Sequence, residues 1–245
     1  MAKIHLIMPM GGNGSRFSVC GYHQPKPLIP IYGKPFFYWA AQSVLKFVEV
    51  IDITFVILKE HIVGYGLDKE ILKYFPAARI KVLDHVLNGP VLTCLEGIKH
   101  IDDDCCILFN DCDHLFKSEA FNRACENNEI CGLDGALLTF KSDLPQYSYI
   151  RYENGRITGT VEKKVVSSDA ICGAYLFQSA SQFRRLAETY FGNCEYKEYF
   201  ISGMYNVMAQ QHGVIRQYDT DYHIPFGIPQ EYKEALKDEH YKELE

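Results

Sequence analysis

The chain has 245 residues, of which 47% are hydrophobic and 23% charged, with a formal net charge of −6. This composition excludes a disordered or low-complexity protein. The acidic balance argues against a nucleic-acid coat, because duplex binding draws on clustered Lys and Arg. A chain of this length can form one α/β domain with a complete core.

No targeting or membrane-spanning segment is expected. The apolar run at 4–10 is too short to cross a bilayer and lacks the layout of a signal peptide. The nine cysteines contain no Cys-x-x-Cys pair. We therefore expect reduced thiols in a cytoplasmic protein, without membrane insertion.

Short apolar runs alternate with helical patterns along the chain. Strands are predicted at 3–8, 53–58, 80–83, 105–109, 135–140, 147–152, 156–162, 171–177 and 214–219. Helices are predicted at 35–48, 67–75, 90–100, 118–128, 180–191, 196–211 and 229–243. The alternation predicts an α/β fold, a mostly parallel sheet with helices on both faces. The turn signal Asn154-Gly155 within the strand-rich segment 134–177 predicts a small antiparallel insertion.

The loop after the first strand is rich in glycine. Gly11, Gly12 and Gly14 let the backbone turn sharply, and successive N–H groups in such a turn can hold an anion. The loop is not a Walker A motif, because no Gly-Lys-Ser/Thr follows, and Phe17 stands where a dinucleotide fingerprint needs glycine. The glycines alone are equally consistent with a tight strand-to-helix turn.

Two basic residues follow this loop. Arg16 comes directly after it, and Lys26 stands between two prolines, on stiff extended backbone that can aim the ammonium with little loss of entropy. A guanidinium and an aimed ammonium beside a nest of N–H groups suit a triphosphate and its leaving pyrophosphate.

The strand at 105–109 runs into a pair of acids. Asp111 and Asp113 project to the same side of an extended chain and repel each other unless a cation lies between them. Mg²⁺ is commonly bound by one or two carboxylates together with substrate phosphates. The alternative is a helix cap plus a surface acid. The neighbouring His114 is expected to line the edge of the cleft.

The run MPMGGNGSRF, followed by PKPLIPIYGKPFFYWA, resembles the nucleotidyltransferase signature G-G-x-G-[ST]-R…K-P-[LM]-[LI]-P-[IV]…K-P. That family includes sugar-1-phosphate nucleotidyltransferases and choline-phosphate cytidylyltransferases. The resemblance implies a three-layer, Rossmann-like (GT-A-like) fold. Because the sequence has no long linker, internal repeat or break in composition, we expect a single domain, with a nucleotide-binding half at 1–133 and a second-substrate half at 134–245. It also implies transfer of an NMP group from an NTP to a phosphorylated small molecule, with release of pyrophosphate.

The resemblance assigns roles to individual residues. Arg16 would meet the β and γ phosphates and Lys26 the α phosphate. Asp113 or Asp111 would be the Mg²⁺ ligand, with Asp113 favoured because His-Leu-Phe follows it. The residues assigned to the nucleotide are Met10, Gly11, Gly12, Gly14, Ser15, Gly89 and Asp111.

Three further matches concern the substrates and a second metal ligand. Gly89 matches the family, but Asp84 stands where a base-reading Gln is usual, which leaves the base open, with CTP or UTP favoured over ATP or GTP. Glu162 and Lys163 would face the second substrate. The family's second metal-binding acid falls at Pro225 here, so Asp219 or Asp221 would have to supply it.

The expected function is therefore that of a cytoplasmic nucleotidyltransferase making precursors of cell-surface (capsule) polysaccharide. Its second substrate would be a sugar 1-phosphate or a non-sugar phosphate such as phosphocholine. One rival is a metal-dependent glycosyltransferase that uses Asp111 and Asp113 as a D-x-D motif, and another is a non-catalytic nucleotide-binding module. The sequence leaves the oligomeric state open, a homo-oligomer included.

Overall fold

The computed structural model describes residues 3–102 and 104–244. Its main sheet has nine strands in the order β10-β9-β11-β6-β1-β4-β5, with β8 paired to β11 and β12. The strands of this sheet are β1 (Ile4–Met10), β4 (Val50–Leu58), β5 (Arg79–Leu83), β6 (Cys106–Asn110), β8 (Gly135–Lys141), β9 (Ser148–Glu153), β10 (Arg156–Glu162), β11 (Asp169–Phe177) and β12 (Ile215–Asp219).

Seven of the nine strands run in one direction, and only β10 and β11 run against them. The hairpin of β9 and β10 turns at Asn154 and Gly155, which both have positive φ, as its sequence signal requires. The predicted fold class, a mostly parallel sheet with a small antiparallel insertion, is thus confirmed.

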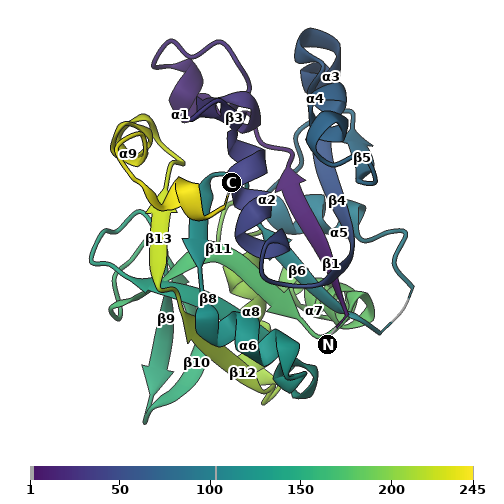
Figure 1. Cartoon of the computed structure of the whole chain (residues 1–245). Coiled ribbons are helices and arrows are strands. Elements are labelled where there is room, and N and C mark those ends of the chain that lie inside the picture. The colour runs from purple at the N-terminus through teal and green to yellow at the C-terminus, as the bar shows by residue number, and fades with distance from the viewer. Residues whose placement is uncertain (1–2, 103, 245) are drawn as a thin grey trace.

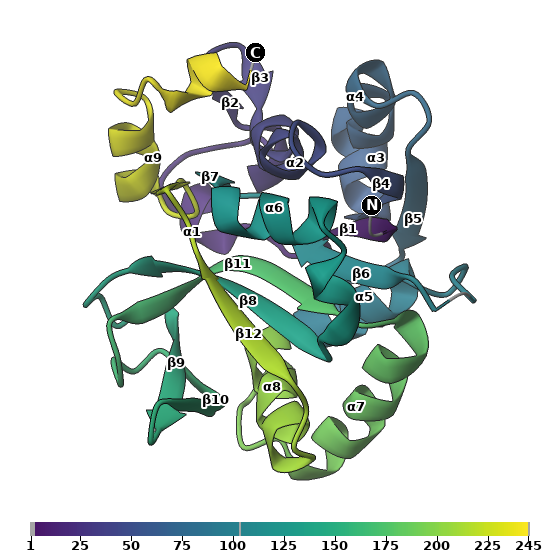
Figure 2. The ribbon, with the colours of Figure 1, turned by 60° about the horizontal axis from the view of Figure 1, so that its bottom comes forward.

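Helices cover both faces of the sheet (Figure 2). On one face lie α2 (Phe36–Leu45), α4 (Leu67–Tyr74) and α6 (Glu119–Glu126), and on the other α5 (Pro90–Gly97), α7 (Ala180–Asn193) and α8 (Ile201–Gln210). Each helix buries an apolar stripe, such as Phe37 and Val44 of α2 or Phe183 and Leu186 of α7. Burial of such side chains is the main favourable contribution to folding.

A third apolar cluster lies beyond the carboxyl end of β1. It joins α1 (Ser15–Ser18), the hairpin of β2 (Pro30–Ile31) and β3 (Lys34–Pro35), and the C-terminal α9 (Pro229–Ala235), which gather at the top of Figure 1. The two short strands β7 (His114–Lys117) and β13 (Tyr222–Pro225) pair beneath them. This cluster fixes the C-terminal segment beside the acid pair.

Several predicted boundaries were wrong. The helix expected at 196–211 begins only at Ile201, because the irregular segment before it is bonded through Tyr199 to the loop at Asn88. The helix expected at 229–243 is α9 followed by a separate 3₁₀ turn, His240–Glu243, in which the buried ring of Tyr241 packs on Trp39. Strand β7 and helix α3 (Lys59–Tyr65) were missed.

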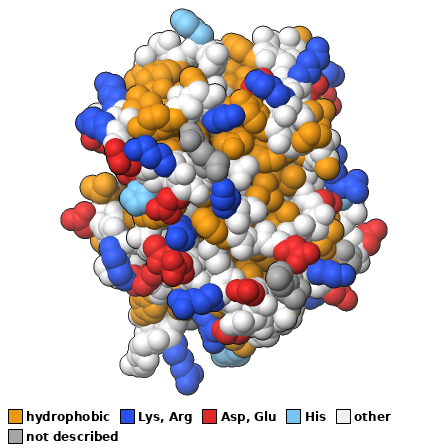
Figure 3. All heavy atoms as spheres, viewed as in Figure 1, with side chains coloured by type: hydrophobic (Ala, Val, Ile, Leu, Met, Phe, Trp, Pro, Cys, Tyr) orange, Lys and Arg blue, Asp and Glu red, His pale blue; other side chains and the backbone are white. Residues whose placement is uncertain are grey.

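The surface and the thiols agree with the composition. On the face that Figure 3 shows, Lys and Arg side chains lie among Asp and Glu side chains, so charge of neither sign gathers into a stripe there. None of the nine cysteines, all of which the structure describes, is joined to another in a disulfide. Across the described ranges, no helix has both the length and the apolar character needed to cross a bilayer.

Candidate functional site

The glycine loop and the acid pair lie at one edge of the sheet. β1 and β6 are adjacent and parallel, with Ile7 opposite Phe109. Their carboxyl ends therefore meet at the same edge, which is where open α/β sheets bind ligands. The loop leaves β1 at Met10, and Asp111 follows β6.

The first of two cavities at this edge, the loop cavity, has a volume of about 460 Å³. It is bounded by the glycine loop, the segment 86–90, Lys26 and Cys112. Gly14 has a φ of +61°, and a Cβ there would lie 3.0 Å from the Cβ of Lys26. Gly14 thus serves both the turn and the close approach of Lys26. Met10, Gly11, Gly12 and Ser15 also line this cavity.

Gly89 joins two loops at the far wall of the loop cavity. Its φ is +98°, and a Cβ would stand 2.4 Å from the backbone nitrogen of Tyr199. The N–H of Val91 donates to the carbonyl of Tyr199 at 3.0 Å. Only glycine fits this contact. Asp84, by contrast, lies outside the cavity and pairs with Lys59 at 3.2 Å.

Asp113 is held from three sides. Its Oδ2 accepts a hydrogen bond from Lys26 Nζ at 2.8 Å. A Cβ on Gly227 would lie 2.4 Å from that same oxygen, and the N–H of Phe226 donates to the carbonyl of Asp113 at 2.9 Å. Burial alone would raise the pKa of Asp113, but the charge and hydrogen bond of Lys26 lower it below its usual value. Asp113 is therefore ionised and fixed.

Asp111 has a different environment. Its N–H donates to the carbonyl of Gly173 at 2.9 Å, and Gly173, at a φ of +96°, leaves room for the carboxyl group. Burial, followed by the negative charges of Asp113 and Glu162, raises the pKa of Asp111 to about 7, against the opposing effect of Lys26. The two aspartates thus divide into one that is charged and one that is poised to titrate.

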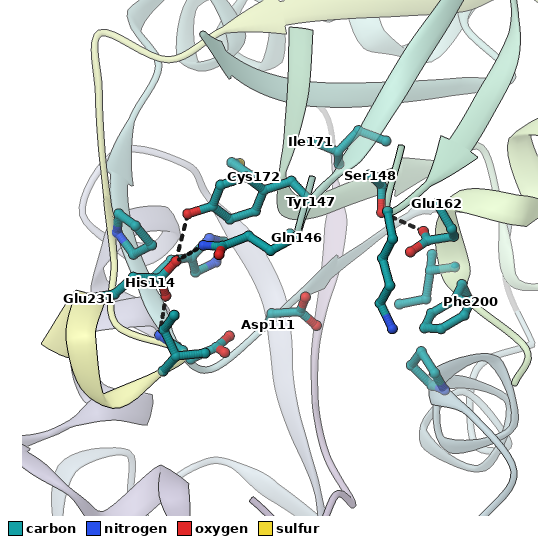
Figure 4. Close-up of a pocket in the computed structure, with 18 of the residues that line it drawn as sticks. Asp111, His114, Gln146, Tyr147, Ser148, Glu162, Ile171, Cys172, Phe200 and Glu231 are labelled. Carbon is teal, nitrogen blue, oxygen red and sulfur yellow. Dashed lines mark hydrogen bonds between the residues drawn. The ribbon is translucent and has the colours of Figure 1, made fainter. Parts of the chain in front are cut away.

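The second cavity, which we call the acceptor cavity, has a volume of about 360 Å³ and lies on the other side of the acid pair. Figure 4 shows Asp111 between two banks of side chains, with Glu162 and Phe200 on one and Gln146, Tyr147 and Glu231 on the other. The two cavities share Pro90 and Glu198 in their linings.

Glu162 and Lys163 lie in one bank of the acceptor cavity. Glu162 accepts hydrogen bonds from the hydroxyls of Ser148 and Ser202. Lys163 adopts a φ of +52°, which is uncommon for a residue with a side chain, and its Nζ lies 5.1 Å from the centre of the Phe200 ring. Arg16 lines this cavity and not the loop cavity.

His114 also lines the acceptor cavity, but it is almost fully buried rather than at its edge. Its Nε2 lies 2.9 Å from Oδ1 of Asn110. Burial lowers the pKa of His114 to about 4, so the ring is neutral at physiological pH. A neutral, hydrogen-bonded ring at this position supports the wall of the cavity.

Sequence reasoning missed the residues in the opposite bank of the acceptor cavity. It also missed Glu198, which lines both cavities. Glu231 accepts hydrogen bonds from Tyr147 and Gln146, which come from the segment between β8 and β9. Glu198 belongs to the irregular segment between α7 and α8. The only available signal was Glu231 two residues after Pro229, which indicates a helix start but not a cavity wall.

The two acids predicted as second metal ligands lie elsewhere. Asp219 accepts a hydrogen bond from Oγ1 of Thr139 at 2.9 Å. Asp221 accepts one from the backbone N–H of Glu119 at 2.7 Å and so caps α6. Neither lines the acceptor cavity. The structure does not bring them to Asp111 and Asp113.

Asp111 and Asp113 nevertheless suit a magnesium ion. Among the residues that the structure describes, no three His, Cys, Asp or Glu side chains converge to hold a metal alone. The two carboxylates in the lining of the acceptor cavity would instead need substrate phosphates to complete the oxygen shell, which is the usual arrangement for Mg²⁺. Mg²⁺ prefers oxygen ligands and commonly takes some of them from substrate phosphates, so a site of two carboxylates suits this ion.

Asp111→Asn is expected to stabilise the metal-free protein above neutral pH. Folding raises the pKa of Asp111 from near 3.8 to about 7. The free energy of unfolding of the wild-type protein therefore has its full contribution from Asp111 below about pH 4 and loses it as the pH rises through 7. The neutral amide avoids that loss, so unfolding at pH 8 with a chelator should require on the order of 1–3 kcal/mol more than wild type. Thermal unfolding at pH 4 and pH 8 measures this. An equal difference at both pH values would contradict the environment derived for Asp111.

Comparison with solved structures identifies the fold class. A nucleoside-diphosphate-sugar pyrophosphorylase from Vibrio cholerae superposes with a TM-score of 0.81 at 21% identity, covering 95% of this chain and 100% of the other. A protein described as a glucose-1-phosphate thymidylyltransferase from Bacillus anthracis gives 0.77 at 21%, covering 96% and 94%. A UDP-glucose pyrophosphorylase gives 0.75 at 18%, covering 99% and 100%.

The chain therefore has the fold of the sugar nucleotidyltransferases over nearly its whole length. Neither the protein-family models nor the curated proteins include a match to the sequence. At 18–21% identity the solved structures establish the fold, and the activity has to be argued from the site.

Proposed function

We propose that this protein is a Mg²⁺-dependent nucleotidyltransferase that moves an NMP group from an NTP to a phosphorylated small molecule and releases pyrophosphate. The observation that carries the proposal is a pair of neighbouring cavities that share Pro90 and Glu198. Asp111 and Asp113 line the acceptor cavity, and Lys26, which lines the loop cavity, is bonded to Asp113 at 2.8 Å. A reaction between two phosphorylated substrates needs one place where both can be bound side by side. Acidic side chains that can hold a metal ion and a basic side chain must lie close together there.

The two substrates divide between the cavities. The loop cavity takes the NTP, because the glycine loop offers backbone N–H groups and Lys26 borders it. The acceptor cavity takes the phosphate monoester, which Lys163 meets as a point charge. Arg16 follows the glycine loop in the sequence and would meet the β and γ phosphates of the NTP, although its side chain lines the acceptor cavity in this structure. Residues 1–133 form the nucleotide half on this division, with 134–245 supplying most of the acceptor wall.

The chemistry asks little of the protein beyond positioning and charge. A phosphate monoester is already an anionic nucleophile, so no strong base is required, and Lys26 can balance charge that develops at the α phosphate. Mg²⁺, bound by Asp113 and Asp111 with the substrate phosphates, would neutralise further negative charge at the reacting groups.

The finer assignments follow the sequence. We propose that the NTP is CTP or UTP rather than ATP or GTP. We propose that the acceptor is a sugar 1-phosphate or a non-sugar phosphate such as phosphocholine, and that the product is a precursor of cell-surface polysaccharide. A glycosyltransferase with a D-x-D motif shares the acid pair but has no need of an ammonium bonded to it. Pyrophosphate release from each of four NTPs, against a panel of phosphorylated metabolites with Mg²⁺, tests these assignments together. Release from no pair would contradict the proposal.

Lys163→Ala is expected to raise KM for the acceptor by roughly 10- to 150-fold, the usual effect of losing one charged hydrogen-bond partner. NTP binding, measured by calorimetry with Mg²⁺, should stay nearly unchanged, because Lys163 lines only the acceptor cavity. Lys164→Ala is the matched control, since it removes an adjacent exposed lysine outside both linings. Weakened NTP binding in Lys163→Ala would contradict the division of the cavities.

A further inference from the structure

Glu231 links three parts of the chain through one carboxylate. Its Oε1 accepts hydrogen bonds from the hydroxyl of Tyr147 and from Nε2 of Gln146, each at 2.6 Å. Its Oε2 accepts the backbone N–H of Gly227 at 3.1 Å. Figure 4 shows these side chains converging at one bank of the acceptor cavity.

Helix capping explains only one of these bonds. Glu231 is the third residue of α9, a position from which an acidic side chain often accepts an N–H just before the helix. The bond to Gly227 fits that role. Tyr147 and Gln146 belong to a segment more than 80 residues earlier, and a helix cap does not need them.

Gly227 in turn bears directly on Asp113. A Cβ on Gly227 would lie 2.4 Å from Asp113 Oδ2 and 3.6 Å from Glu231 Oε2. The backbone of Gly227 therefore borders the Asp113 carboxylate at the same oxygen that accepts the hydrogen bond from Lys26 Nζ. A shift of Gly227 would let the Asp113 carboxylate move. A reacting or metal-binding group that is loosely held supports a slower reaction than one that is fixed.

We propose that Glu231 is a positioning residue that fixes the position of the Asp113 carboxylate through Gly227. Through Tyr147 and Gln146, Glu231 also links that position to the wall of the acceptor cavity. The inference rests on the proposed function, because it assigns Glu231 to the site in which Asp113 serves the transfer. It predicts that the acceptor wall and the acid pair respond together to a change at Glu231.

Two variants separate this role from simple support of the helix. Glu231→Ala removes all three bonds and should lower kcat by about 10- to 100-fold and also raise the acceptor KM. Gly227→Ala keeps Glu231 but puts a methyl group against Asp113, so it should lower kcat to a similar degree with the acceptor KM nearly unchanged. Glu231→Gln retains one acceptor oxygen and should fall between wild type and Glu231→Ala.

Glu234→Ala is the control, since Glu234 lies on the same helix, pairs with Lys237 and lines neither cavity. It should behave as wild type. A wild-type kcat in Gly227→Ala, or equal losses in Glu234→Ala and Glu231→Ala, would overturn the inference.

A second readout is independent of turnover. If Glu231 and Asp113 are coupled through Gly227, the loss of Tm in the double variant Glu231→Ala/Asp113→Asn should differ by about 2 °C or more from the sum of the single losses. Additive losses would contradict the coupling even if the enzyme is active. A non-additive result in a protein that transfers no nucleotide would contradict the proposed function and leave the positioning of Asp113 supported.

Discussion

Asp113→Asn should lower kcat by at least about 10²-fold, on the order of 3 kcal/mol in the barrier, at saturating Mg²⁺. The side chain keeps its shape, but it loses the charge that pairs with Lys26 and that would help hold the metal. Asp111→Ala is the companion variant, because the sequence left the main metal ligand open between the two acids. Steady-state kinetics with pyrophosphate detection measures both.

Asp143→Asn is the control for Asp113→Asn, since it neutralises an exposed carboxylate outside both cavities. It should leave kcat unchanged. Near wild-type turnover in both Asp113→Asn and Asp111→Ala would show that neither carboxylate serves the metal.

Lys26→Ala is expected to depress kcat more than it raises KM for the NTP. The ammonium lies between the glycine loop and Asp113, and although burial opposes it, the charge and hydrogen bond of Asp113 raise the pKa of Lys26. It is therefore a fixed positive charge, and its largest effect falls where negative charge develops during transfer. We expect a kcat loss of about 10²- to 10³-fold, the range found when one main electrostatic stabiliser is removed.

Lys59→Ala serves as the control, because Lys59 is exposed and pairs with Asp84 outside the cavities. Arg16→Lys, which keeps the charge but loses the planar fork, should also be impaired. Weaker NTP affinity with unchanged kcat in Lys26→Ala would reduce Lys26 to a binding residue.

Local patterns predicted the parts of the fold that local chemistry determines. Apolar runs and the Asn154-Gly155 turn depend on neighbouring residues, so the strands of the sheet and its antiparallel hairpin could be read from them. The start predicted at 196 for the helix α8 was wrong because Tyr199 is bonded to the loop around Gly89, more than 100 residues away. The sequence pattern within 196–211 does not indicate that contact.

The site shows the same limit. The glycine loop, Arg16 and Lys26 lie in one short segment whose combined motif resembles a family signature, and the acid pair lies in another. The parallel pairing of β1 and β6 places both segments at one edge of the sheet, where Lys26 bonds Asp113. Glu231 faces the acceptor cavity only because β13 pairs with β7 and carries α9 beside Asp113. Asp219 and Asp221 were chosen by proximity in sequence, and the backbone turns them toward Thr139 and Glu119 instead.

The most direct test of the proposed transfer follows the fate of the phosphates. CTP or UTP labelled at either the α or the γ phosphate is incubated with Mg²⁺, the protein and a mixture of sugar 1-phosphates and phosphocholine. We predict that the α label appears in a new diphosphate-linked product and the γ label in pyrophosphate, in equal amounts and only when the acceptor mixture is present. Transfer of the γ label to an acceptor, or release of pyrophosphate without a product carrying the α label, would contradict nucleotidyl transfer between the two cavities.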